Sequence, residues 1–301
     1  MSGSPTPLTP GFYLRMLGIP LIWGAAFIPG KIAVAALPPG MASFARYTAA
    51  SLSLVAVTLV VDKRLVWPRG RQWAGLALLG LTGIAAYNFL MFLSLAEIPA
   101  SRTAMIVALS PALIAVGSAV FQGEKMSPLR WLGVALALAG AWIVLSHGDV
   151  ANIHLALGKG EYYMLGAVGC WVSYTLLSRK VLGQGLSILA ATTWSSLIGT
   201  LMLLPLALLA LPHLGEKASH PAPWLAVAAM GVFGTGVAFL WYAEGIRRIG
   251  ATRTAVFTNL VPVFAVAAAW LFLGETITGS LLLGGAVTLV GVFLVNGVGR
   301  K

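Results

Sequence analysis

Long apolar stretches alternate with short polar connections along almost the whole chain. Each stretch ends at charged residues, prolines or glycines, which break helices or favour water. A helix that crosses a bilayer needs about 20 apolar residues. The pattern therefore predicts an all-α integral membrane protein in which residues 1–301 form a single transmembrane domain. It contains ten transmembrane helices, near 13–36, 41–61, 74–96, 103–121, 131–146, 162–178, 187–211, 224–246, 254–272 and 280–298.

The composition excludes the main alternatives to a membrane protein. The chain is 59% hydrophobic and only 9% charged, with a mean hydropathy of +0.92, so it cannot cover a water-soluble surface. A single cysteine excludes a disulfide scaffold. The first span is long and lacks a small-residue cleavage site, so we expect a retained helix and not a signal peptide.

The basic residues are distributed unevenly between the predicted connections. A net charge of +11 would suggest nucleic acid in a soluble protein. Here most basic residues fall on one side of the predicted membrane, which explains the charge without nucleic acid and predicts that both termini are cytoplasmic. These residues are Arg15, Lys63, Arg64, Arg69, Arg71, Lys125, Arg130, Arg179, Lys180, Arg247, Arg248, Arg253, Arg300 and Lys301, against Arg102, Lys159 and Lys217 on the other side.

The chain repeats itself. Residues 98–104 (IPASRTA) match residues 249–255 (IGATRTA) at an offset of 151, and the same offset superposes Gly123-Glu124 on Gly274-Glu275. Each copy, 13–146 and 162–298, holds five spans, and because five is odd the second copy enters the membrane from the opposite side. Inverted repeats are the architecture of many secondary transporters, in which two halves rock around a site at the midplane. An ancient duplication in a receptor or membrane enzyme is the alternative.

The residues shared between the copies also carry a family resemblance. The chain resembles two EamA repeats of the drug/metabolite transporter superfamily, and within it looks most like exporters of aromatic amino acids. The resemblance implies a central cavity and efflux of amino acids or related metabolites. The second copy departs from the pattern, with Val261 in place of Ser110 and no basic residue matching Arg46. The pattern is carried by Trp23-Gly24, Phe27, Lys31, Phe44, Arg46, Arg102-Thr103-Ala104, Ser110-Pro111, Gly123-Glu124, Gly133 and Gly140.

Two prolines mark candidate breaks in the helices. Pro111 and Pro262 fall near the centres of spans 4 and 9, where each removes a helical hydrogen bond and frees a carbonyl one turn back. Ser110 and Asn259 are close by and could bind that backbone or a substrate. Irregular backbone at this depth is tolerated where it faces protein or a wet cavity, so these four residues are predicted to border a substrate site. A kink that serves packing alone is the alternative.

Aromatic and amide side chains form a second candidate constellation. Rings near mid-span could stack on a planar substrate, and Asn88 could bind an α-carboxylate or an α-amino group. The alternatives are ordinary packing for each ring and an interhelical hydrogen bond for Asn88. The predicted substrate-binding residues of this group are Trp23, Phe27, Tyr87, Asn88, Met91, Trp171, Tyr174, Trp241 and Tyr242.

Charges inside the spans are few. Lys31 could attract a substrate carboxylate, or reach water or a carbonyl instead, and Arg46 has a weaker claim. Glu244 is expected to pair with Arg247 or Arg248. No carboxylate lies near the centre of a span, so transport is expected to be facilitative.

The sequence thus favours export of small metabolites, amino acids first, by alternating access. The alternatives are proton-coupled efflux of drugs or quaternary amines, and a structural or receptor-like protein that transports nothing. No phosphate loop or zinc motif indicates an enzyme, a cofactor or a metal. The expected partners are a small-molecule substrate and the lipid bilayer. A small-residue stripe at Gly133, Ala137 and Ala141 is expected to pack within the bundle, while the choice between monomer and homodimer stays open.

Overall fold

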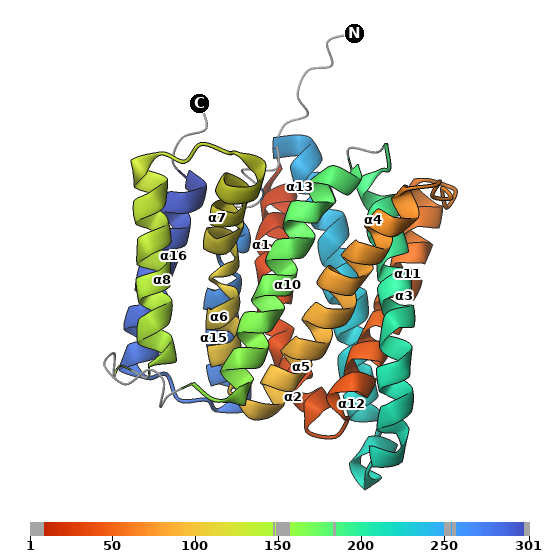
Figure 1. Cartoon of the computed structure of the whole chain (residues 1–301). Helices are drawn as coiled ribbons and strands as arrows, with labels where there is room; N and C mark the ends of the chain where they lie inside the picture. The colour runs from red at the N-terminus through yellow and green to blue at the C-terminus, as the bar shows by residue number, and fades with distance from the viewer. Residues whose placement is uncertain are drawn as a thin grey trace.

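The chain folds into a bundle of long helices, which we describe from a computed structural model (Figure 1). The description covers residues 9–146, 148, 157–182, 185–249, 254 and 257–297. Outside it lie several residues named in the sequence analysis: 250–253 of the repeat match, His147, His154, Arg300, Lys301 and the side chain of Arg247. The helices are α1 (Pro10–Ala25), α2 (Phe27–Val34), α3 (Pro39–Val61), α4 (Gln72–Leu79), α5 (Tyr87–Glu97), α6 (Ala100–Val107), α7 (Ser110–Gln122), α8 (Pro128–Leu145), α10 (Lys159–Leu182), α11 (Ile188–Ala210), α12 (Pro221–Ala229), α13 (Ala238–Ile249), α15 (Val261–Leu273) and α16 (Gly279–Gly297), with the π-helices η1 (Gly80–Ala86) and η4 (Met230–Val237) and the short 3₁₀-helices η2 (Leu211–His213) and η3 (Glu216–Ser219).

The helices are long and apolar enough for a membrane protein. Eight helical segments of the described chain meet the length and hydropathy of a membrane span. The apolar helix α15 is shorter, and α10, which carries charges at both ends, is not among the eight. Each predicted span overlaps a described helix, although the ninth, 254–272, is described as helical mainly from Val261 onward, and ten membrane crossings remain a prediction. The eight segments are Pro10–Val34, Pro39–Val61, Gln72–Glu97, Ala100–Gln122, Pro128–Leu145, Ile188–His213, Pro221–Tyr242 and Gly279–Asn296.

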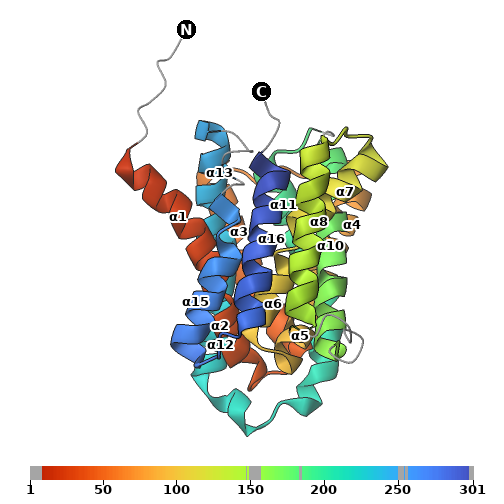
Figure 2. The same cartoon turned by 90° about the vertical axis from the view of Figure 1, so that its left-hand side faces the viewer.

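The two halves of the bundle run in opposite directions. Both described ends of the chain lie at one end of the molecule (Figures 1 and 2). The connection from α7 to α8 lies at that same end, whereas the connection from α15 to α16 lies at the opposite end. Gly123 and Gly274 end α7 and α15 with nearly the same left-handed backbone, at φ 68° and 65°. Equivalent turns at opposite ends are what an inverted repeat requires.

Several spans are interrupted near their middles. The span that contains Pro111 breaks between Val107, the last residue of α6, and Ser110, the first of α7. Proline has no N–H to give the carbonyl four residues earlier, so the helix is interrupted where the sequence predicts. The described chain before Pro262 likewise leaves helical geometry at 259–260.

Two π-helices were not predicted. η1 interrupts the span between α4 and α5, and η4 interrupts the span between α12 and α13. The repeat offset of 151 carries Gly80–Ala86 onto 231–237, which lies within η4. The same irregularity therefore occurs at the same place in both copies. Such insertions in helices are frequent at functional sites.

Helices α8 and α16 pack together at one edge of the bundle (Figure 1). A β-carbon at Gly133 would lie 2.7 Å from the Gly291 carbonyl oxygen, and Gly140 faces Gly284 just as closely. Glycine is required here because the two backbones touch. The small-residue stripe of α8 thus packs within the bundle, as predicted, and not against a second protomer.

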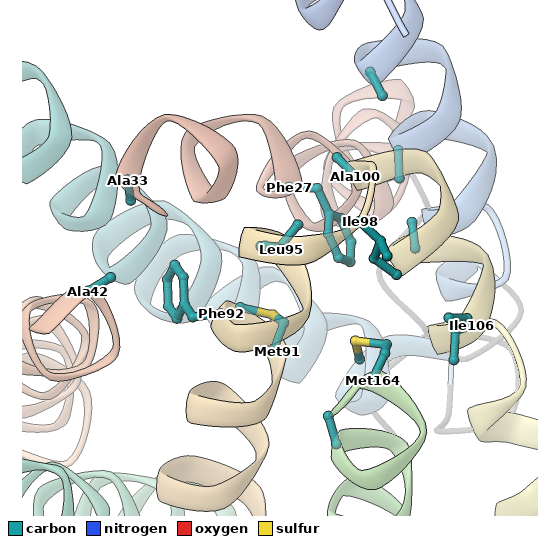
Figure 3. Packing of buried hydrophobic residues seen from close by; sticks show 14 of the residues in the cluster. Phe27, Ala33, Ala42, Met91, Phe92, Leu95, Ile98, Ala100, Ile106 and Met164 are labelled. Atoms are coloured by element: carbon teal, nitrogen blue, oxygen red, sulfur yellow. The ribbon is translucent and has the colours of Figure 1, made fainter. Parts of the chain in front are cut away.

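The largest apolar cluster joins helices from both copies. Phe27, Phe92, Leu95 and Met164 are buried together with small residues such as Ala100 (Figure 3). This cluster fixes α2, α5, α6 and α10 against one another and holds the candidate site residues on α5 and α10 in place.

Candidate substrate site

Three of the predicted aromatic residues come together from two helices. The Tyr87 ring centroid on α5 lies 5.3 Å from that of Trp171 on α10, and Trp171 stacks on Tyr174 at 5.1 Å with an interplanar angle of 25°. The Tyr174 ring packs directly on Gly83 of η1, where a side chain would leave no room. All three rings are half-buried. We call this group the aromatic wall; its contact with a substrate stays a prediction.

A polar network adjoins this wall. The Arg46 guanidinium on α3 donates to Asn88 Oδ1 at 2.8 Å and contacts Met91 Sδ at 3.7 Å. Asn88 is fully buried, and its amide nitrogen donates to the Ile84 carbonyl in η1 at 2.8 Å. Asn88 directly follows Tyr87 on α5. The Arg46 Nε atom is buried with no hydrogen-bond partner in the described part of the chain. The network therefore holds a positive charge beside the aromatic wall.

The other predicted aromatic residues form a second group on α1 and α13. The Trp23 indole N–H donates to the Gly234 carbonyl in η4 at 2.7 Å, and its ring lies 5.7 Å from that of Tyr242. Trp241 packs against Gly18, where a β-carbon would be 2.6 Å from its ring. No described acceptor takes the indole N–H of Trp171, which stacks on Tyr174. The Trp23 N–H is therefore bonded within the protein, whereas the Trp171 N–H has no acceptor among the described residues.

Two residues at the helix breaks carry buried polar atoms that lack a described partner. Ser110 Oγ has no hydrogen-bond partner among the described residues, nor does the amide nitrogen of Asn259. Asn259 Oδ1 accepts from Asn296 Nδ2 at 3.0 Å. A buried polar group without a partner costs free energy, so native proteins rarely leave one without a reason. Pro111 is half-buried and Pro262 is buried beside these groups.

Lys31 and Phe27 both lie on α2, and both contact other helices of the protein. Lys31 Nζ donates to the Leu95 carbonyl oxygen at 2.7 Å. That carbonyl is left over at the end of α5 because the residue four positions later is Pro99, which has no N–H. Phe27 is in the large apolar cluster (Figure 3). Of the two expectations left open for Lys31, the structure shows the bond to a carbonyl.

The charged residues match the sequence analysis only in part. The sequence predicts Arg102 in an external connection, and this prediction is wrong. Arg102 is buried in α6 and pairs with Glu161. Glu244 pairs with Arg248, one of the two expected partners, and also with Arg15. The sequence analysis gave Arg46 a weaker claim to the substrate than Lys31, yet Arg46 contacts two predicted site residues, Asn88 and Met91. No local pattern indicates the Arg102–Glu161 pair, since the two residues belong to different copies.

The described residues offer no metal site. No group of three or more His, Cys, Asp or Glu side chains within those ranges could hold a metal ion. The arrangement can bind polar and aromatic groups, and nothing in it indicates covalent chemistry.

The fold and this site define a class of protein, an integral membrane transporter built from two inverted helical repeats. The chain belongs to the EamA-like transporter family, whose model matches residues 12–146 and 158–297. Members of that family are transporters and not enzymes.

Individual relatives agree with this assignment. The chain is 26% identical to the uncharacterized transporter YyaM of Bacillus subtilis (strain 168), with 96% of this chain and 94% of the relative covered. It is 28% identical to a probable terminal-alkyne amino-acid exporter of Streptantibioticus cattleyicolor, with 91% and 89% covered. A solved crystal structure superposes with a TM-score of 0.66 at 20% identity and covers 97% of this chain and 99% of its own, which shows a shared fold.

Proposed function

We propose that this transporter exports amino acids, aromatic ones included, by alternating access through a central cavity. The two copies, 13–146 and 162–298, would move against each other around the breaks at Pro111 and Pro262. The distribution of basic residues supports cytoplasmic termini in an inner membrane. The similarity to a probable amino-acid exporter supports the substrate class.

One observation carries the choice of substrate. The Arg46–Asn88 pair lies next to the wall of Tyr87, Trp171 and Tyr174, so a charged donor adjoins a surface suited to a planar ring. An amino acid with an aromatic side chain offers both matching parts, a carboxylate for the guanidinium and a ring for stacking. The indole N–H of Trp171, which has no acceptor among the described residues, would be a further donor. We assign recognition to Arg46 and Trp171, whereas Asn88, whose amide is bonded to Arg46 and to the Ile84 carbonyl, holds the guanidinium in position.

The main alternative is efflux of cationic drugs. A quaternary amine could stack on the same rings by cation–π attraction. The Arg46 charge opposes this, because a like charge repels a cation and no carboxylate lies near mid-span to offset it. We therefore favour substrates that carry a carboxylate.

The test is exchange of labelled substrate in proteoliposomes loaded with unlabelled substrate. We expect exchange of phenylalanine, tryptophan and leucine and none of tetraphenylphosphonium. Trp171→Phe keeps the ring and removes the donor, and we expect its KM to rise about tenfold, the effect of losing one hydrogen bond to a charged group. Trp270→Phe on the exposed face of α15 is the matched control and should leave exchange unchanged. Equal KM values in the two variants would contradict the assigned site.

A second measurement addresses energy coupling. Since no titratable carboxylate lies near mid-span, an imposed pH gradient should change the flux by less than about twofold. Strong dependence on the gradient would favour the proton-coupled alternative.

A further inference from the structure

Glu275 covers the start of a helix that belongs to the other copy. Its carboxylate accepts the backbone N–H groups of Ala100 at 2.7 Å and Ser101 at 3.0 Å, and the Ser101 hydroxyl at 2.5 Å. The first N–H groups of a helix have no partner within it, and the helix dipole favours an anion there. The α15–α16 connection thus supplies the cap that α6 lacks in its own sequence, where Pro99 precedes the first turn.

The repeat offers a direct comparison for this contact. Glu124 is the counterpart of Glu275 at the offset of 151, and each follows a glycine with nearly the same left-handed backbone. Glu124 lies at the end of the molecule near the termini and pairs with Arg179, a half-exposed ion pair. The two turns are alike, but the positions that match Ala100 and Ser101, 251 and 252, lie outside the described part of the chain. Among the described residues, the two carboxylates have different partners.

The position of the Glu275 cap suggests movement. It joins a connection of the second copy to α6 of the first, at the end opposite the termini, and Glu275 is only half-buried, so water can replace its hydrogen bonds. The nearby Arg102–Glu161 pair is fully buried, and breaking it would leave charges without water. Of these two polar contacts, the Glu275 cap is the one whose hydrogen bonds water can replace.

We propose that Glu275 is a latch that holds this end of the transporter closed, and that its release from Ala100 and Ser101 opens this end. This inference rests on the proposed alternating access. Glu275 is a positioning residue: it touches no substrate and acts through the N-terminus of α6. Its loss should shift the molecule toward the state that is open at the end opposite the termini.

The experiment measures opening without any substrate. Cys170, the single cysteine, is replaced by alanine, and Thr103→Cys places a thiol in the first turns of α6, where Thr103 is fully buried. The rate at which N-ethylmaleimide modifies that thiol in nanodiscs reports opening. Glu275→Ala should raise the rate at least about tenfold, since charge-assisted hydrogen bonds are lost. Glu124→Ala, the matched control, should stay within about twofold of the parent because an exposed pair contributes little.

The outcomes separate the possibilities. A rate for Glu275→Ala within twofold of the parent, with normal elution on size exclusion, would overturn the latch. Equal acceleration by Glu124→Ala would also overturn it, since general loosening would then be the cause. If Glu275→Ala does not fold, Ser101→Ala removes one of the three donors and should give a smaller acceleration; no acceleration would count against the latch. Absence of amino-acid exchange in the parent would contradict the proposed function but would leave the labelling result intact.

Discussion

Arg102 Nε lies 2.9 Å from Glu161 Oε1, and the two residues are only 6% and 3% exposed. Arg102 also donates to the Leu145 carbonyl at 2.6 Å, and Glu161 accepts the Gly158 N–H at 2.9 Å. This pair therefore joins α6 and α10, which belong to different copies, within a buried network. Breaking one side of a buried pair leaves the other charge without compensation.

We expect Glu161→Ala to lower the free energy of unfolding by about 3–5 kcal/mol. Thermal unfolding in detergent, followed by circular dichroism, measures the loss. Arg102→Met combined with Glu161→Leu removes both charges, so the double variant should be more stable than Glu161→Ala alone. A double variant less stable than either single variant would show that the charges stabilise the protein beyond compensating each other.

A glycine-to-alanine substitution should have opposite effects on stability at the α8–α16 contact and at an open position of α10. Gly133→Ala forces a β-carbon against the Gly291 carbonyl, so we expect a loss of about 1–3 kcal/mol from overpacking. Gly169→Ala on α10 meets open space and should raise stability by about 0.5–1 kcal/mol, because alanine favours the helix. Thermal unfolding of the two variants side by side is the measurement. If Gly133→Ala were as stable as Gly169→Ala, the two backbones would not touch.

Lys31 gives a prediction that separates packing from binding. Because its ammonium group satisfies the Leu95 carbonyl, Lys31→Met leaves a carbonyl unpaired and should cost about 1–3 kcal/mol of stability. We expect the KM for phenylalanine exchange to change by less than about twofold, in contrast to Trp171→Phe. A large rise in KM at unchanged stability would assign Lys31 to the substrate instead.

The orientation of the repeats can be tested by labelling from either side of the membrane. Lys125→Cys and Thr276→Cys, in the cysteine-free background, occupy exposed positions of the two equivalent turns. A membrane-impermeant thiol reagent should reach Thr276→Cys from outside intact cells and Lys125→Cys only after the membrane is opened. Labelling of both from the same side would contradict the inverted arrangement.

The spans are predictable because apolar length is a local property. The prediction of 41–61 corresponds to α3, Pro39–Val61, and that of 280–298 to α16, Gly279–Gly297. The break at Pro111 was also predictable, since a proline without an N–H interrupts a helix wherever it stands. Part of the aromatic wall was predictable, because spacing by three or four residues places Trp171 and Tyr174 on one face of a helix.

Contacts between the copies could not be predicted from local patterns. Glu275 and Ala100 are 175 residues apart, and nothing near either of them indicates the other. The place of Arg46 in the candidate site could not be predicted for a similar reason, since it depends on a hydrogen bond to Asn88 on another helix. The π-helices could not be predicted either, because their residues, such as those of Gly80–Ala86, are also compatible with an ordinary α-helix.

The paired π-helices bear on how this molecule arose. A π-helix results when one extra residue is accommodated within a helical turn. Since η1 and η4 occupy the same place in both copies, the simplest history has the extra residue already present in a single ancestral chain of five helices. Before its gene doubled, that ancestor would have needed two identical subunits in opposite orientations to make the same bundle.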